Sequence, residues 1–152
     1  MAVGDDTVAY RRDLPHLQKR GKTYFVTFRS YRRLWLSSQA RDLVLDSCIY
    51  DHQKLCWIHC VVVMPDHVHM LTTPFPESTL EVILRRLKGA SGYRVNQLMK
   101  RHGKVWQRES FDHILRTDEK VRQKAEYILA NPVRAGLVTN PALYQWWWRA
   151  DD

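Results

Sequence analysis

The chain has 152 residues, of which 45% are apolar and 26% charged, and 24 lysines and arginines against 16 aspartates and glutamates give it a formal net charge of +8. This length fits one domain and excludes a large eight-stranded α/β barrel, which needs about 250 residues. No apolar run approaches the roughly 18 residues of a membrane span, the first residues do not resemble a signal peptide, and the three cysteines form no ligand-like pair. We therefore expect a cytoplasmic, single-domain protein with reduced thiols and no membrane contact.

The first part of the chain predicts a strand followed by a helix. Residues 1–21 are polar, and we expect them to be loosely ordered. The β-branched and aromatic run over 22–29 predicts a strand. Ser37 or Ser38 is a candidate N-cap for a helix that ends near His52.

The remainder of the chain continues the alternation of strands and helices. Five more elements are predicted: strands over 55–64, 67–73 and 111–116, a long helix that starts at a Ser78–Glu81 capping box, and a last helix that Asp118 caps and Asn131-Pro132 stops. Gly89 and Gly92 are potential breaks in the long helix. This order implies an α+β fold, with helices packed on one face of an antiparallel sheet. We expect one domain over 22–145 and a C-terminal tail over 146–152.

Basic residues are concentrated in two stretches of the chain. Residues 82–108 hold eight basic residues and no acidic one, and a second basic stretch runs over 11–33. A solvated helix face would explain such a pattern, but so would a polyanionic partner, because phosphate neutralisation drives most non-specific nucleic-acid binding. We therefore predict nucleic acid as the partner, contacted by the basic residues of the long helix: Arg85, Arg86, Lys88, Arg94, Lys100 and Arg101.

Two histidines in the predicted strand over 67–73 form the sharpest local motif. Side chains two residues apart in a strand face the same side. His67 and His69 should therefore project together, while Val68 and Met70 enter the core. Two imidazoles at this spacing can share a metal ion. The alternative is a pair of exposed histidines without a function, since an isolated His-x-His often arises by chance.

The last predicted helix carries a second set of polar side chains on one face. Tyr127 and Asn131 are four residues apart, and Lys120 and Lys124 lie on the same side. A helix that covers the sheet near the histidines would bring a phenol and an amide oxygen beside them. Otherwise Tyr127 is a residue at the core margin and Asn131 is a helix cap.

Three motifs occur in a suggestive order. They are Asp-His-Val-His-Met-Leu over 66–71, Val-Trp-Gln-Arg over 105–108 with Phe-Asp-His-Ile over 111–114, and the run from Glu126 to Val138. In this set the chain resembles the REP-associated tyrosine transposases, within the HUH single-tyrosine transposase superfamily. The resemblance covers about 10–144, and its most specific part is Tyr-Ile-x-x-Asn-Pro-Val-x-x-Gly-Leu-Val.

The resemblance implies a ferredoxin-like antiparallel sheet whose central strand carries His-x-His. It implies that Tyr127 is the nucleophile and that His67, His69 and Asn131 bind a divalent metal. Mg²⁺ or Mn²⁺ suits this mixed nitrogen and oxygen ligand set. Lys120 and Lys124 are expected to contact the DNA and to stabilise the phenolate as it attacks.

The predicted function is therefore metal-dependent nicking and strand transfer on single-stranded DNA, on hairpins of the REP palindrome type. A 5′-phosphotyrosine intermediate keeps the bond energy, so no nucleotide cofactor is needed, and the protein would act as a monomer or homodimer. The alternative is a catalytically silent hairpin DNA- or RNA-binding protein, such as a repressor. An amidohydrolase-type metal site would need ligands from a barrel that this chain is too short to form. Should Tyr127 prove dispensable, Tyr93 is the next candidate nucleophile.

Several aromatic and polar residues near these motifs have two interpretations each. Asp112 and His113 either help to shape the site or form a hydrogen-bonded pair at a sheet edge. Trp106 either stacks on an unpaired base or packs in the core. The Trp146–Trp148 run either contacts DNA or plugs the C-terminal end of the domain, where relatives usually continue with a Pro/Ser-rich segment.

Overall fold

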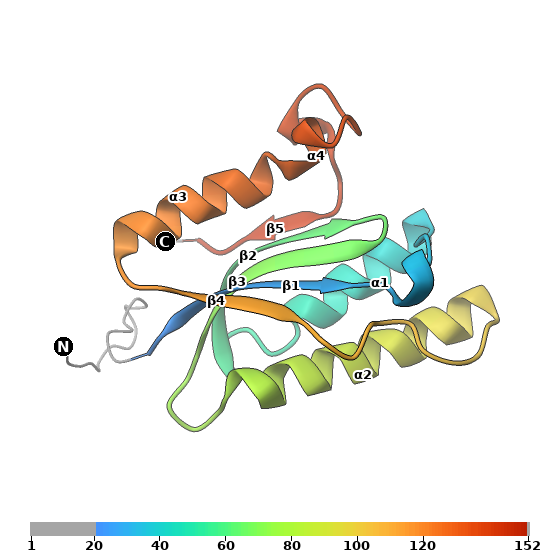
Figure 1. Ribbon diagram of the computed structural model, residues 1–152, viewed down its shortest axis with the longest axis horizontal. Coiled ribbons are helices and arrows are strands. Elements are labelled where there is room, and N and C mark those ends of the chain that lie inside the picture. Colours follow the sequence, from blue (N-terminus) through green and yellow to red (C-terminus); the bar gives the residue numbers. More distant parts are fainter. Residues whose placement is uncertain (1–20, 152) are drawn as a thin grey trace.

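The computed structural model describes residues 21–151, so the expected loose segment over 1–21 lies outside the described residues except for Gly21. Figure 1 shows a sheet with helices above and below it. The elements are β1 (Thr23–Arg29), η2 (Tyr31–Arg33), α1 (Ser38–Ile49), β2 (Cys56–Met64), β3 (His67–Pro74), α2 (Leu80–Met99), β4 (Phe111–Leu115), α3 (Asp118–Leu129), α4 (Asn131–Arg134), η3 (Pro141–Leu143) and β5 (Trp147–Arg149). None of these helices is long and apolar enough to cross a membrane.

The sheet has the strand order β4-β1-β3-β2-β5, and every neighbouring pair is antiparallel. The β1-α1-β2-β3-α2-β4 succession with this order is the ferredoxin-like arrangement, so the predicted fold class is confirmed. β3, which carries both histidines, is the central strand. Because strands pair on both of its sides, its backbone is held rigidly and is a firm support for functional side chains.

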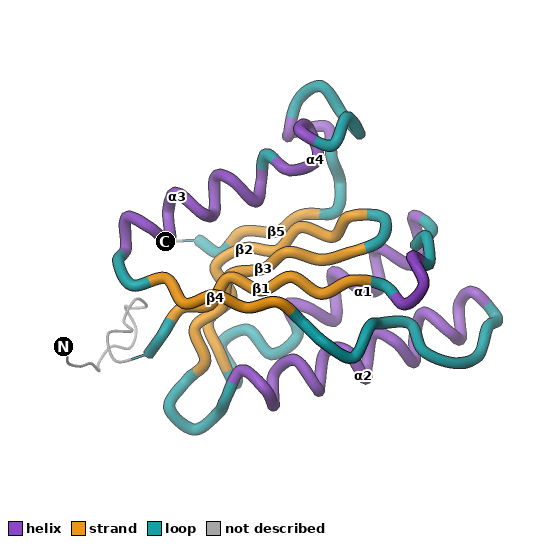
Figure 2. The backbone as a smooth tube through the Cα atoms, in the orientation of Figure 1, coloured by secondary structure: helices purple, strands orange, loops and turns teal. Residues whose placement is uncertain are grey.

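Helices cover both faces of the sheet, so the prediction that they pack on one face is wrong. Val68 and Met70 point into a core shared with α1 and α2, whereas Leu71 packs in a second core with Ile128 of α3. Figures 1 and 2 show α3 on one side of the sheet and α1 and α2 on the other. The physical reason is that the inner strands are apolar on both faces, and a single layer of helices would leave one face exposed to water.

Helices α1, α2 and α3 each begin after an N-cap residue with a hydroxyl side chain. Two of these N-caps lie one residue away from the predicted position. Ser37 caps α1, as expected. Thr79 caps α2, and Thr117 caps α3, each by accepting a hydrogen bond from a backbone amide three residues later. The predicted Ser78–Glu81 capping box is therefore not formed. The glycines of α2 do not interrupt it.

The C-terminal segment over 146–152, expected as a tail that either plugs the domain or contacts DNA, is attached to the domain. Residues 147–149 form the edge strand β5 along β2. The Tyr144 hydroxyl donates to the Val63 carbonyl at 2.5 Å, and the Trp146 indole nitrogen donates to Asp42 at 2.8 Å. β2 needs a partner on this side because its outer backbone groups would otherwise be unpaired.

Candidate active site

The two histidines of β3 project from the same face of the sheet, as their spacing predicts. Their ring centroids are 4.8 Å apart. Val68 and Met70 lie between and beside them and are fully buried on the opposite face. The pair lies at the start of β3, next to the turn that follows β2, and this is the face that α3 partly covers.

Each histidine ring is oriented by a hydrogen bond at its Nδ1 atom. Asp66 Oδ1 accepts from His67 Nδ1 at 2.8 Å. Thr27, on the neighbouring strand β1, places its hydroxyl 2.8 Å from His69 Nδ1. A partner on Nδ1 leaves Nε2 as the outward-facing nitrogen, and such partners are what fix the ring orientation and basicity of metal-binding histidines.

His69 is neutral over the ordinary pH range. Burial, together with the nearby charges of His67, Arg29, Arg134 and Lys124, lowers the pKa of His69 to about 3. Phe25 stacks on its ring at a centroid distance of 5.6 Å, which accounts for part of this burial. A neutral ring keeps one nitrogen lone pair, and it also adds no charge of its own to the site.

Tyr127 of α3 and His69 of β3 line the same open groove, which has a volume of about 680 Å³. Tyr127 is 52% exposed. The ammonium of Lys124 lies 4.7 Å from the centroid of the Phe25 ring on β1 and 4.8 Å from that of Tyr127. Helix α3 therefore brings the Tyr127 phenol to the histidine side of the sheet. Tyr93, on α2, lies in a different groove on the other side.

Asn131 begins α4, directly after the bend at Ala130 that ends α3. Its side-chain oxygen accepts a hydrogen bond from Arg134 at 3.1 Å. The Arg134 guanidinium carbon in turn lies 3.8 Å from the centroid of the Tyr127 ring. Arg134 thus joins the phenol and the amide, a contact that sequence reasoning missed although the residue lies inside the most specific motif.

These residues fit a divalent metal by the chemistry of their donor atoms. Within residues 21–151, no three His, Cys, Asp or Glu side chains gather in a metal-binding cluster. A metal at His67 and His69 would therefore complete its shell with oxygens from an amide, water or phosphate. The Asn131 oxygen has a second lone pair free for this purpose, and such a mixed shell suits Mg²⁺ or Mn²⁺.

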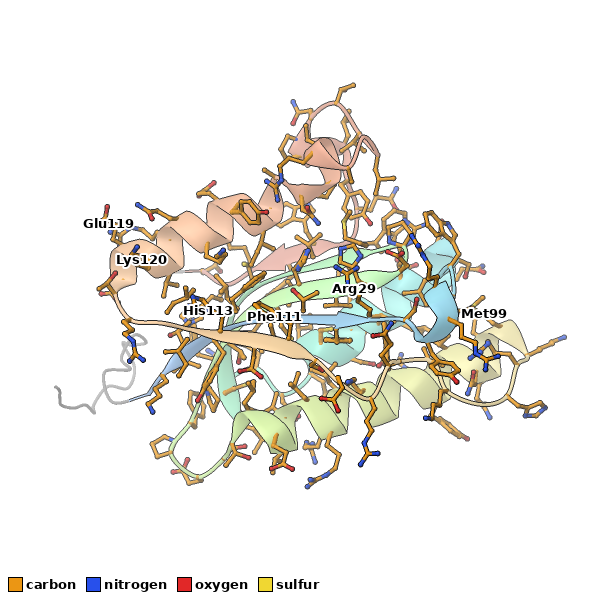
Figure 3. All side chains as sticks on the ribbon, viewed as in Figure 1. Arg29, Met99, Phe111, His113, Glu119 and Lys120 are labelled. Carbon is orange, nitrogen blue, oxygen red and sulfur yellow. The ribbon has the colours of Figure 1, made fainter. Side chains whose placement is uncertain are left out.

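Most of the basic residues that the sequence points to are located away from this groove. Arg85, Arg86, Lys88 and Arg94 belong to α2, Lys100 is its C-cap and Arg101 follows it. Helix α2 lies on the other side of the sheet (Figure 1). Four of them contact their own chain: Arg86 pairs with Asp51 at 2.8 Å, Lys88 donates to Ser110 at 2.9 Å, Arg94 donates to Ser47 at 3.2 Å, and Arg101 donates to Asn96 at 2.6 Å. Lys120 is exposed in the first turn of α3 (Figure 3), and only Lys124 lines the groove.

Strand alternation and burial decide between the two interpretations of Asp112, His113 and Trp106. Asp112 pairs with Val26 and His113 with Phe25. Since these partners face opposite sides of the sheet, Asp112 lies on the α2 side and only His113 on the α3 side. Trp106 is buried and donates its indole N–H to Ser91 at 2.9 Å, so it packs in the core.

Comparison with known proteins agrees with this arrangement. A Haemophilus influenzae protein that is named a REP-associated tyrosine transposase is 25% identical over an alignment of 146 residues. The alignment covers 85% of this chain and 78% of that protein. A solved REP-associated tyrosine transposase bound to a REP hairpin is 23% identical and has a TM-score of 0.70, over 84% of this chain and 76% of the other. A bacterial tRNA(His) guanylyltransferase-like protein in complex with GTP is 12% identical and has a TM-score of 0.50, over 78% of this chain and 67% of the other.

The fold alone therefore does not determine the chemistry, since proteins with different chemistry share it. A family model gives the decisive match. The model for IS200-like transposases matches residues 18–131, which is well over half of the chain and includes the histidine pair, Tyr127 and Asn131. The chain belongs to the IS200-like transposase family.

Proposed function

We propose that this protein nicks single-stranded DNA beside a hairpin and transfers the cut strand, with Tyr127 as the nucleophile. The observation that carries the proposal is the groove shared by Tyr127 and His69. The groove is lined by the Tyr127 phenol from α3 and the neutral His69 imidazole from β3. Lys124 and Arg134 lie against the phenol ring. A nucleophile next to positive charge is what attack on an anionic phosphodiester requires.

The chemical step exchanges one phosphoester bond for another. The Tyr127 phenol loses its proton to solvent, and its oxygen attacks phosphorus in line with the 3′-oxygen of the scissile bond. The bond from phosphorus to that oxygen breaks, and the oxygen takes up a proton to leave a free 3′-hydroxyl. The other strand end stays on Tyr127 as a 5′-phosphotyrosine, and attack by a different 3′-hydroxyl reverses the step and releases the phenol.

His67, His69 and Asn131 would hold a divalent metal in this mechanism. When bound, the metal supplies Lewis-acid stabilisation of the phosphate and a template for its oxygens. Asp66 and Thr27 orient the two rings toward that task, through contacts of 2.8 Å each. Arg29 and Lys124 line the groove and neutralise the charge of the strand that enters it.

The proposed substrate is a single strand with a REP-type hairpin. This part of the proposal is supported by the resemblance to a transposase whose structure contains a REP hairpin. It is also supported by the formal net charge of +8, because a basic surface favours a polyanion.

The test is a covalent adduct on a denaturing gel. The protein is incubated with a labelled hairpin oligonucleotide that carries single-stranded flanks, in the presence of Mn²⁺. We expect a slowly migrating adduct from the natural chain and none from Tyr127→Phe, which should still bind the hairpin. Tyr93→Phe is the matched control, because Tyr93 is 67% exposed but lines the groove on the α2 side.

Adducts formed by Tyr127→Phe would overturn the assignment of the nucleophile. Binding without any adduct, with Mg²⁺ and with Mn²⁺, would instead favour the alternative function. In that case the chain is a hairpin-binding protein that keeps the fold without cleavage.

A further inference from the structure

The loop between β1 and α1 is hydrogen-bonded to the turn that precedes the histidine pair. The Ser30 amide donates to the Asp66 carbonyl at 2.9 Å, and the Leu36 amide donates to the Pro65 carbonyl at 2.7 Å. Asp66 is the residue that orients His67. The segment between these two anchors is therefore a direct neighbour of the proposed cleavage site.

Inside the loop, two successive arginines adopt a left-handed backbone. Arg32 has φ of 53° and Arg33 has φ of 56°. Residues with side chains seldom take this conformation, and they keep it only where their surroundings impose it. The Tyr31 amide, which donates to the Val105 carbonyl at 2.7 Å, is one such constraint. Unfavourable backbone conformations of this kind are concentrated at functional sites.

The result of this turn is an exposed tryptophan. Trp35 is 61% exposed, although the next residue, Leu36, is completely buried. Trp106, by contrast, packs in the core beside the same loop, where Ser30 forms a bridge to it. The exposed indole offers a flat apolar face on which a planar group can stack.

The two segments that meet at this loop are basic, and the nearby Asp66 carboxylate is paired with His67. Residues 22–41 contain no acidic residue, and neither do residues 100–108, which run beside them. The guanidinium carbon of Arg32 and the ammonium of Lys104 lie 5.2 and 5.4 Å from the centroid of the Tyr31 ring, so the two segments share one basic surface. This surface suits a partner that carries both planar rings and negative charges.

We propose that Trp35, Arg32 and Arg33 bind the unpaired nucleotides of the strand that enters the cleavage site. A base stacks on the Trp35 indole, and the two arginines contact the flanking phosphates. Stacking on an aromatic side chain is the common way in which proteins hold single strands without reading their sequence. This inference deepens the proposed function and rests on its choice of single-stranded DNA as substrate.

The test compares two oligonucleotides in equilibrium binding. One is a blunt hairpin, and the other is the same hairpin with a single-stranded extension of about five nucleotides. All proteins carry Tyr127→Phe and are measured in EDTA, so that no covalent product forms. We expect Trp35→Ala to weaken binding of the extended hairpin about tenfold and to leave the blunt hairpin unaffected, while Trp35→Phe retains most of the affinity.

Tyr50→Ala is the matched control. Tyr50 is also an exposed aromatic residue beside a cation, since it is 63% exposed and the Lys54 ammonium lies 3.8 Å from its ring centroid. Tyr50 is the C-cap of α1, at the opposite end of that helix from the loop. We expect this variant to bind both oligonucleotides like the parent protein.

The arginines are tested through salt dependence. Arg32→Gln and Arg33→Gln should each reduce the slope of log affinity against log salt by about 0.7 for the extended oligonucleotide. Unchanged affinity of Trp35→Ala for the extended hairpin would overturn the proposal. An equal loss on both oligonucleotides would also overturn it, because it would indicate a duplex contact or a folding defect.

The failure of this inference is distinguishable from failure of the proposed function. The adduct assay depends on Tyr127, whereas the binding assay is carried out without cleavage. A chain that forms adducts but whose Trp35→Ala variant binds normally contradicts only the role of the loop. A chain that forms no adduct but shows the expected loss contradicts only the nicking activity.

Discussion

The two faces of the sheet differ in how completely they are closed. The face toward α1 and α2 carries a continuous apolar core in which Val26, Phe28, Val68 and Met70 are fully buried. The face toward α3 is apolar around Leu71 but polar where β3 begins. One short helix covers this second face only partly. The open part is where the imidazoles, the phenol and the groove are found, so the proposed chemistry and the larger apolar core lie on different faces.

The basic residues differ in the same way only in part. On the α2 side, Arg86 is paired with Asp51, while Arg85 and Lys88 line a second groove of about 1040 Å³. On the α3 side, Arg29 and Lys124 line an open groove with Tyr127. A count of charges along the sequence does not distinguish these situations, because the distinction depends on what the fold places opposite each side chain.

The largest effect should come from the residue that orients His67. Asp66→Ala removes the acceptor on His67 Nδ1, which lies at 2.8 Å, and should slow adduct formation by about 10- to 100-fold while raising the Mn²⁺ concentration needed. Adduct yield against time, at several Mn²⁺ concentrations, measures both quantities. Asp112→Ala is the control on the other face and should leave the rate unchanged. Equal rates for Asp66→Ala and the natural chain would contradict the role given to His67.

A second substitution tests whether the α2 side is structural. Arg86→Ala leaves the Asp51 carboxylate, only 9% exposed, without its ion partner, and should lower the free energy of unfolding clearly more than Arg85→Ala does. Urea unfolding measures this change. Arg85→Ala, at an exposed position on the same helix, should change stability by less than about 0.5 kcal/mol. If Arg86→Ala instead kept its stability and lowered the salt dependence of hairpin binding, DNA would contact this side too.

A third expected effect is a change in the pH dependence of stability. Burial, together with the nearby His52, lowers the pKa of His59 to about 4. The unfolded chain therefore binds a proton at His59 below about pH 6.5 that the folded chain excludes down to about pH 4. Stability is fully present above pH 6.5 and falls by at most about 1.4 kcal/mol per pH unit across this window. His59→Gln should flatten the slope by that amount in urea titrations, and an unchanged slope would contradict the burial of His59.

The elements were predictable because their signals are local. Hydroxyl caps, alternating strands and the stop at Asn131-Pro132 are read within a few residues. The use of both sheet faces depends on distant packing, yet one signal pointed to it. Val61, Val62 and Val63 are consecutive and all fully buried, and an unbroken apolar run is typical of a strand that is covered on both faces.

The site was predictable only in part. The shared direction of His67 and His69 follows from strand geometry alone. Thr27 next to His69 follows from the register of β1 against β3, which no local pattern specifies. The contact of Arg134 with Tyr127 depends in the same way on the bend at Ala130, whose direction the sequence does not reveal.

The place of β1 in the sheet has a consequence for how the protein is made. β1 is the first strand of the sheet in the chain, but both of its neighbours, β3 and β4, are translated later. During synthesis it must wait on the ribosome until residue 115 has emerged before its two edges are paired. Tyr127 emerges later still, so a nascent chain cannot join its phenol to the histidine side of the sheet until nearly the whole domain has left the exit tunnel.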